Sequence, residues 1–154
     1  MQIADILTPE RTHCQIQLTN KEHVFKYFSQ LFATGSDSLT SHEIFECLLE
    51  REQLGSTGLG KGIAIPHARV TQCEVSLAAF LQLNQGIEFD ALDNQPVDLL
   101  FALVVPEQAT QEHLELLAQL AAMFGDAHFR EQLRCAQNCS EKFNLLTQWR
   151  PLVD

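Results

Sequence analysis

The sequence predicts an α/β (α+β) fold in which helices flank a β-sheet on both faces. Segments with helical periodicity occur toward both ends of the chain, and segments rich in apolar and β-branched residues occupy its middle. Residues 97–105 are apolar almost without interruption. Such a run is typical of an interior strand covered on both faces, so helices are expected on both sides of a sheet whose strand order stays open.

Two helices are expected in the first third of the chain. Thr19 and Glu22 have the spacing of a capping box, and apolar residues then recur at helical spacing as far as Gly35. Thr40 begins the second helix with the same kind of start signal, and Gly55 supplies its C-terminal stop. The second helix therefore leads directly into the glycine-rich residues that follow.

Three strands are expected after these glycines. Residues 63–65, 75–83 and 97–105 are rich in apolar or β-branched residues and are bounded by turn-forming residues, which is typical of strands. Pro66 fixes its own φ and keeps Ile65 extended, so the first strand is expected to end there.

Two more helices complete the predicted fold. One begins at Thr110, and the last follows an N-cap at Ser140 and ends before Pro151. The helix after Thr110 is expected to bury one apolar face. That face consists of Leu114, Leu117, Ala121 and Phe124.

The length and charge of the chain restrict its class. Its 154 residues show no repeat or low-complexity tract, which favours a single domain that spans residues 1–154. The formal net charge of -10 has the wrong sign for binding a nucleic-acid backbone. No apolar run reaches the roughly 20 residues that span a bilayer, and the first residues do not resemble a signal peptide. We therefore expect no nucleic acid, no membrane insertion and a cytoplasmic location.

The five cysteines predict reduced thiols. Their number is odd and their spacing contains no CxxC pair, which disfavours a disulfide framework. Cys135 and Cys139 are four residues apart, so they are expected to share one face of a helix. No neighbouring ligand completes a zinc site with them, and we expect no metal.

Residues 55–62 contain four of the seven glycines and invite a nucleotide-binding interpretation. Gly55 through Lys61 matches the GxxxxGK part of a P-loop. The match fails at Gly62, where a Ser or Thr hydroxyl should hold Mg²⁺, and the segment follows a helix rather than a strand. We therefore do not expect a nucleotide.

His67 is the strongest candidate for a reactive residue. It follows the proline at the carboxyl end of the first predicted strand, where open α/β sheets place their binding sites. Histidine is also a neutral nucleophile near neutral pH. The simpler interpretation of a lone histidine is a solvated surface residue. We assign that interpretation to His13, His23, His42 and His128.

Several donor groups are expected near His67. Arg51 lies in the last turn of the second helix, where its guanidinium can reach back and bind a phosphate. Ser56, Thr57 and the glycine backbone add further donors, and His113 can supply a second imidazole. The simpler alternatives are that Arg51 only complements the helix end and that His113 lies on the surface of its helix.

The segment Gly60-Lys-Gly-Ile-Ala-Ile-Pro-His67-Ala68 resembles the phosphorylation-site signature of one family. That family is the mannitol/fructose-type enzyme IIA domains of the bacterial phosphoenolpyruvate-dependent sugar phosphotransferase system. Residues 54–60 and 89–106 are similar to its nitrogen-regulatory branch (IIA-Ntr). The resemblance spans nearly the whole chain. Ala68 departs from the glycine that often follows the histidine, and Lys61 adds a cation at a position that varies.

The resemblance implies a mixed β-sheet flanked by helices and a phosphotransferase that acts through a phosphohistidine on His67. It implies that Arg51 and His113 steady the phosphoryl group. It also implies loop contacts from Ser56 and Thr57, with no metal or nucleotide as cofactor. The implied donor is an HPr-like phosphocarrier protein (NPr), and the implied regulated partners are potassium-transport and nitrogen-linked proteins.

Three functions stay open at this point. The first is a regulatory phosphocarrier, favoured because no transporter domain accompanies the His67 segment. The second is a sugar-specific (fructose or mannitol) enzyme IIA that passes phosphate on to a cysteine of a IIB protein. The third is a binding module that is not phosphorylated and uses Arg51 and the glycine loop as an anion pocket.

Overall fold

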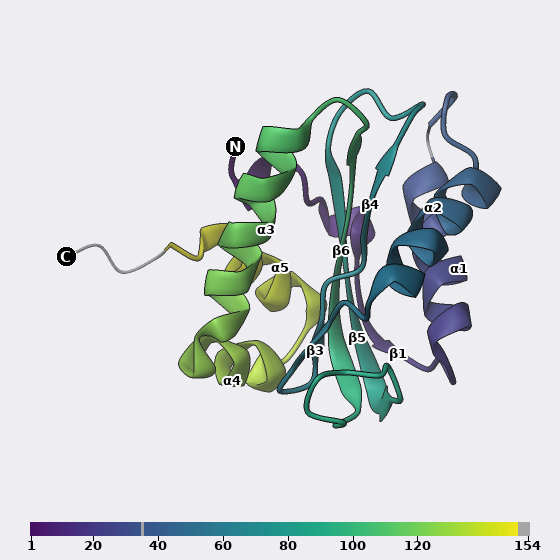
Figure 1. The fold of residues 1–154 in the computed structure, drawn as a ribbon. Helices are drawn as coiled ribbons and strands as arrows, with labels where there is room; N and C mark the ends of the chain where they lie inside the picture. Colours follow the sequence, from purple (N-terminus) through teal and green to yellow (C-terminus); the bar gives the residue numbers. More distant parts are fainter. Residues whose placement is uncertain (35, 151–154) are drawn as a thin grey trace.

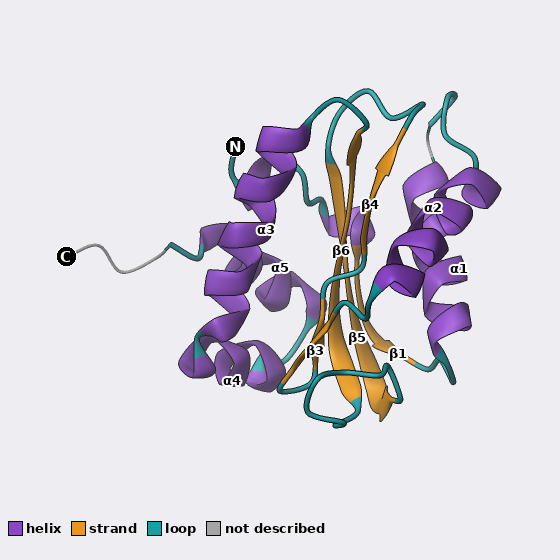
Figure 2. Cartoon of the chain, viewed as in Figure 1, coloured by secondary structure: helices purple, strands orange, loops and turns teal. Residues whose placement is uncertain are grey.

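One β-sheet of six strands lies between two layers of helices in the computed structural model, which describes residues 1–34 and 36–150 (Figure 1). The described α-helices are α1 (Lys21–Ala33), α2 (Ser41–Leu54), α3 (Thr110–Gly125), α4 (Ala127–Cys135) and α5 (Cys139–Gln148). Helices α1 and α2 cover one face of the sheet, and α3, α4 and α5 cover the other (Figure 2). Among the described helices, none is both long and apolar enough to cross a membrane.

The sheet is mixed. The described strands are β1 (Thr12–Ile16), β2 (Gly58–Gly60), β3 (Ile63–Ala64), β4 (His67–Val70), β5 (Leu77–Ile87) and β6 (Val97–Pro106). Their order is β1-β5-β6-β3-β2, and β4 also pairs with β6. Strand β6 is antiparallel to β5 and parallel to β3 and β4. The structure thus confirms the expected mixed sheet flanked by helices on both faces.

Strands β3 and β4 are two parts of one extended segment, interrupted at Pro66. Ala64 of β3 pairs with Leu100 of β6. His67 of β4 pairs with Leu103, which keeps both parts in the same register. Pro66 has no N–H group to donate, but its carbonyl accepts a hydrogen bond from Leu103 at 2.9 Å. β3 ends before Pro66, as predicted, so His67 does follow the end of a strand. The sequence did not predict that His67 also begins a further strand, β4.

Strand β6 is buried on both faces, as its sequence predicts. Leu100, Ala102 and Val104 belong to the core under α1 and α2. The alternate residues belong to the core under α3, α4 and α5, and they are Leu99, Phe101, Leu103 and Val105. All residues from 99 to 105 are 0% exposed, and burying one Leu or Phe side chain contributes about 1.5–3 kcal/mol. This strand therefore anchors both helical layers and β4.

The start of α1 differs from the prediction, whereas both ends of α2 agree with it. Asn20, rather than Thr19, caps α1 by accepting a hydrogen bond from a backbone N–H of the first turn. Thr40 caps α2 in the same way, and Gly55 follows its last residue. The predicted stop of the first helix at Gly35 lies outside the described residues.

The second layer of helices differs more from the prediction. α3 begins at Thr110 as expected, but Leu114 is 60% exposed. The buried residues of α3 are Leu116, Leu120, Met123 and Phe124. α4 has no counterpart in the prediction, and Asn138 caps α5 instead of Ser140. Pro151 lies outside the described residues.

A disulfide joins Cys14 of β1 to Cys139 at the start of α5. The prediction of reduced thiols is therefore wrong for this pair. No spacing motif marks it, because the two residues are 125 positions apart in the sequence. Cys135 ends α4 whereas Cys139 begins α5, so these two cysteines do not share one helix face as expected.

Candidate functional site

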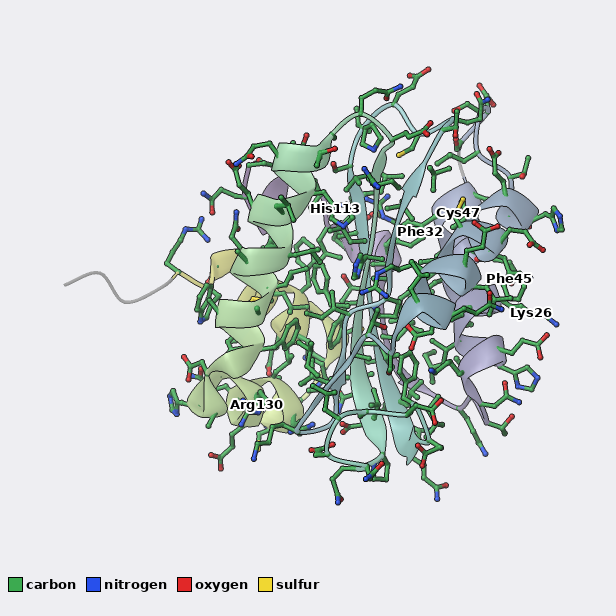
Figure 3. All side chains as sticks on the ribbon, in the orientation of Figure 1. Lys26, Phe32, Phe45, Cys47, His113 and Arg130 are labelled. Atoms are coloured by element: carbon green, nitrogen blue, oxygen red, sulfur yellow. A yellow bond between two sulfur atoms is a disulfide. The ribbon has the colours of Figure 1, made fainter. Side chains whose placement is uncertain are left out.

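A cavity of about 670 Å³ opens over strand β4, at an edge of the sheet. Of the described strands, only β6 pairs with β4. Residues of α2 line the cavity from one face of the sheet and residues of α3 from the other; Figure 3 shows Cys47 and His113 on these two helices. Because the cavity lies at an edge, side chains from both helical layers meet there.

His67, the first residue of β4, lines this cavity and is partly buried. Its Nδ1 atom lies 2.8 Å from the carbonyl oxygen of Ile65. A carbonyl oxygen only accepts hydrogen bonds, so Nδ1 carries the proton and Nε2 keeps its lone pair. Burial lowers the pKa of His67 below 6.5, and the positive charge of Arg51 acts in the same direction. The imidazole is therefore neutral at pH 7 and has one nitrogen free to attack an electrophile.

His113, in the first turn of α3, places a second imidazole beside His67. The two ring centroids are 5.2 Å apart and the ring planes meet at 81°. Burial lowers the pKa of His113 to about 4, and the charges of His67, Arg69 and Arg51 contribute to that shift. Its Nε2 atom is buried and has no hydrogen-bond partner among the described residues. A buried nitrogen of this kind gains free energy when a bound ligand supplies the partner.

Two arginines bring positive charge to the cavity. Arg51 lies in the last turn of α2, as predicted, and its Nη1 donates to the carbonyl of Gly55 at 2.9 Å. Arg69 is absent from the prediction; its Nη1 donates to the Thr110 hydroxyl at 3.4 Å. Arg69 follows His67 by two positions on β4, and such residues point to the same side of a strand. Once β4 is recognised as a strand, the alternation of side chains along it identifies Arg69 as a residue on the same side as His67.

Carboxylates and exposed apolar side chains complete the lining. Glu50 and Glu107 contribute negative charge. Leu54 is 85% exposed and Leu114 is 60% exposed, although both are large apolar residues. Exposed apolar residues around a polar centre are typical of a surface that docks another protein.

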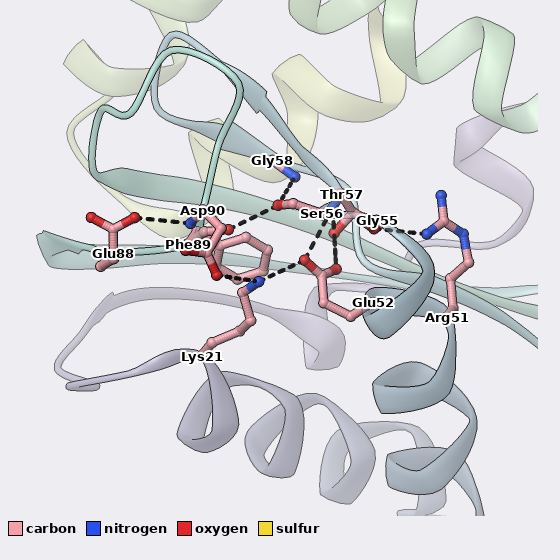
Figure 4. Close-up of polar contacts among 10 residues, drawn as sticks. All are labelled: Lys21, Arg51, Glu52, Gly55, Ser56, Thr57, Gly58, Glu88, Phe89 and Asp90. Carbon is pink, nitrogen blue, oxygen red and sulfur yellow. Dashed lines mark hydrogen bonds and ion pairs between the residues drawn. The ribbon is translucent and has the colours of Figure 1, made fainter.

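Ser56 and Thr57 do not line the cavity. The Ser56 hydroxyl donates to the carbonyl of Phe89 at 2.8 Å and accepts from the N–H of Gly58 at 3.0 Å (Figure 4). Thr57 is buried, and its hydroxyl donates to Glu52 Oε1 at 2.6 Å. The structure therefore does not bring these two hydroxyls to the expected phosphoryl acceptor.

The glycine-rich segment forms a turn between two strands. Gly60, Lys61 and Gly62 join β2 to β3 with φ angles of 96°, 60° and 80°. Positive φ favours glycine, so the turn explains why glycines occur here. None of the described glycines lines the cavity, and the expected backbone cradle for an anion is not formed there.

The fold and this cavity define the class of protein. Residues 5–149 match the family model described as phosphoenolpyruvate-dependent sugar phosphotransferase system, EIIA 2. The chain belongs to this family of phosphotransfer domains. The match confirms the resemblance seen in the His67 segment.

Similar proteins narrow the comparison to one branch of the family. The nitrogen regulatory protein of Pseudomonas aeruginosa is 44% identical over 146 residues, which cover 95% of each chain. The nitrogen regulatory protein of Escherichia coli is 39% identical over 148 residues, which cover 96% of this chain and 90% of the relative. The crystal structure of nitrogen regulatory protein IIA-Ntr from Neisseria meningitidis superposes with a TM-score of 0.90 at 39% identity, over 94% of this chain and 99% of that chain.

A more distant structure shows how widely the fold is shared. IIA mannitol from Escherichia coli is 20% identical and superposes with a TM-score of 0.74, over 90% of this chain and 97% of that chain. This likeness confirms the enzyme IIA mannitol/fructose-type fold. The nitrogen regulatory proteins are markedly more similar in sequence.

Proposed function

We propose that the chain is a cytoplasmic, nitrogen-regulatory phosphocarrier that accepts a phosphoryl group on His67 from an HPr-like phosphohistidine protein (NPr). The observation that carries this proposal is the meeting of two neutral imidazoles with the Arg51 guanidinium in one cavity. In this proposal residues 1–154 act as a single phosphotransfer domain, since the family match extends over residues 5–149.

In the proposed step, Nε2 of His67 attacks the phosphorus atom of the donor phosphohistidine in line. An N–P bond forms on His67 while the N–P bond of the donor breaks, and the donor imidazole leaves with that electron pair. Nδ1 keeps its proton and donates it in a hydrogen bond to the Ile65 carbonyl, so Nε2 remains the attacking nitrogen throughout. The bond made and the bond broken are of the same kind, so the transfer is reversible, as a relay or sensor requires.

Arg51 and His113 are proposed to steady the phosphoryl group. A guanidinium can donate two parallel hydrogen bonds to phosphoryl oxygens, which fixes the group and offsets its charge. The unpartnered Nε2 of His113 can donate a further bond when it carries the proton. Phosphoryl transfer depends mainly on such positioning and charge compensation.

Phosphorylation state is the proposed regulatory signal. A phosphoryl group adds nearly two negative charges at pH 7, beside the carboxylates of Glu50 and Glu107. This change alters which partner surface can dock around Leu54 and Leu114. Relatives named nitrogen regulatory proteins support a regulatory output, and the proposed partners are potassium-transport and nitrogen-linked proteins.

Carrier-dependent labelling tests this proposal. The purified chain is incubated with labelled phosphoenolpyruvate, enzyme I and an HPr-type carrier. We expect label on the wild type and none on His67→Ala, because no other residue takes the nucleophile's place. His128→Ala is the matched control, since His128 is an exposed histidine on α4, and it should be labelled like the wild type. An unlabelled wild type would instead favour the anion-binding module.

A second arm separates the regulatory carrier from a sugar-specific enzyme IIA. Candidate IIB proteins and a sugar are added to the labelled chain. We expect the label to stay on His67 or to return to the HPr-type carrier. Sugar-dependent loss of the label would support the sugar-specific alternative and contradict the regulatory one.

A further inference from the structure

Glu52 follows Arg51 in the sequence and is a buried carboxylate with no part in the transfer step. Successive helix residues point about 100° apart, so Arg51 lines the cavity while Glu52 faces the loop that follows α2. Only 7% of Glu52 is exposed. A buried carboxylate is strongly unfavourable unless hydrogen bonds and an opposite charge satisfy it.

Thr57 and Lys21 satisfy this carboxylate (Figure 4). The N–H group of Thr57 lies 3.2 Å and 3.1 Å from the two carboxylate oxygens, and its hydroxyl donates to Oε1 at 2.6 Å. Lys21 Nζ donates to Oε2 at 2.8 Å and lies 4.7 Å from the centroid of the Phe89 ring. The carboxylate therefore ties α1, α2 and the loop after α2 to one another.

The same loop accepts a hydrogen bond from the side chain of Arg51. Gly55, whose carbonyl accepts from Arg51 Nη1 at 2.9 Å, lies two residues before Thr57. We propose that Glu52 is a positioning residue: by anchoring Thr57, it fixes the loop carbonyl that orients the Arg51 guanidinium toward the phosphoryl-accepting imidazole. This inference rests on the proposed function and deepens it, because it assigns the orientation of the arginine to a residue outside the cavity.

Glu52 also acts on His67 through its charge. Its carboxylate raises the pKa of His67 and so opposes the effect of Arg51. Both Glu52→Gln and Thr57→Val should disturb the orientation of Arg51, but only Glu52→Gln removes the carboxylate charge, so the pKa of His67 should be lower in Glu52→Gln than in Thr57→Val. An NMR titration of His67 distinguishes these two effects, and a general loss of structure would not produce this pattern.

Four variants test the inference. Glu52→Gln removes the charge, and Thr57→Val removes the hydroxyl while it keeps the shape of the side chain. Thr57→Ser restores the hydroxyl. Glu46→Gln is the matched control, because it removes a glutamate charge from an exposed position on the same helix.

Two measurements are made on each variant. The first is the rate of His67 phosphorylation by phosphoramidate, a small donor that needs no docked protein. We expect about 100-fold slower phosphorylation for Glu52→Gln and about tenfold slower for Thr57→Val. Thr57→Ser should recover most of that loss, and Glu46→Gln should match the wild type. The second is the NMR signal of the Arg51 side-chain N–H group, which should shift in Thr57→Val and not in Glu46→Gln.

The outcomes separate this inference from the proposed function. Wild-type rates and an unshifted Arg51 signal in Thr57→Val would overturn the positioning role and leave the phosphocarrier proposal intact. An unlabelled wild type would overturn the phosphocarrier proposal, while a shifted Arg51 signal would still support the positioning role. If Glu52→Gln does not fold, as a thermal melt would show, Thr57→Val and Thr57→Ser decide the question.

Discussion

The two sides of the last turn of α2 differ in how their polar groups are used. On the cavity side, Arg51 and His113 line the same cavity as the His67 imidazole, and the Nε2 atom of His113 has no partner in the described part of the chain. On the loop side, Glu52, Ser56 and Thr57 make their hydrogen bonds within the molecule. Polar residues that look alike in the sequence therefore divide into residues that line the cavity and residues whose hydrogen bonds hold the backbone of the loop.

The largest expected effect lies on the cavity side. Arg51→Gln should slow transfer to His67 about 100-fold, because the charged donor that we propose for the phosphoryl group is lost. The free energy of unfolding should change by less than about 1 kcal/mol, since the Arg51 side chain is only partly buried. Single-turnover labelling and urea denaturation measure the two quantities. A wild-type transfer rate would remove the functional distinction between the two sides.

A smaller effect is expected on the stability of the folded chain when the pH is lowered. Between pH 6.5 and about 4 the unfolded chain binds a proton on His113 that the folded chain does not, because burial lowers the folded-state pKa of this residue to about 4. Stability therefore falls as the pH drops through this window. His113→Asn should lose less stability over the same window, as thermal melts across pH would show. If the stability of the wild type and that of His113→Asn fell equally over this pH window, the low pKa would not belong to His113.

The smallest effect is expected on the loop side. Ser56→Ala removes hydrogen bonds to Phe89 and Gly58, so it should lower the free energy of unfolding by about 1 kcal/mol. Transfer to His67 should change by less than about threefold. Chemical denaturation and labelling again provide the measurements. A large loss of transfer at normal stability would return Ser56 to the phosphoryl-binding site.

Local signals explain the parts of the site that the sequence predicted. A start signal at Thr40 and a stop at Gly55 define α2, and they place Arg51 in its last turn. The apolar run over residues 97–105 required cover on both faces, so the helix that carries His113 packs on the face opposite α2. The position of Arg51 and the presence of helices on both faces follow from neighbours in the sequence, whereas the face on which each helix packs is known only from the structure.

Contacts between distant segments explain the parts that were missed. β1 is a strand because it pairs with β5, as in the pairing of Thr12 with Phe80. β4 has four residues and is defined by its register against β6. The Thr57 hydroxyl is used internally because the carboxylate of Glu52 lies beside it, held by Lys21 from another helix. Periodicity and capping rules contain no information about such pairings.

The disulfide between β1 and α5 makes the intervening chain a closed covalent ring. A single peptide cut within that ring, for instance near Leu92, which is 83% exposed, would leave both fragments attached to each other. Separating them requires the cut and a two-electron reductant together. A protease acting once would therefore produce a nicked protein of unchanged mass on a non-reducing gel, and two shorter chains only after thiol treatment.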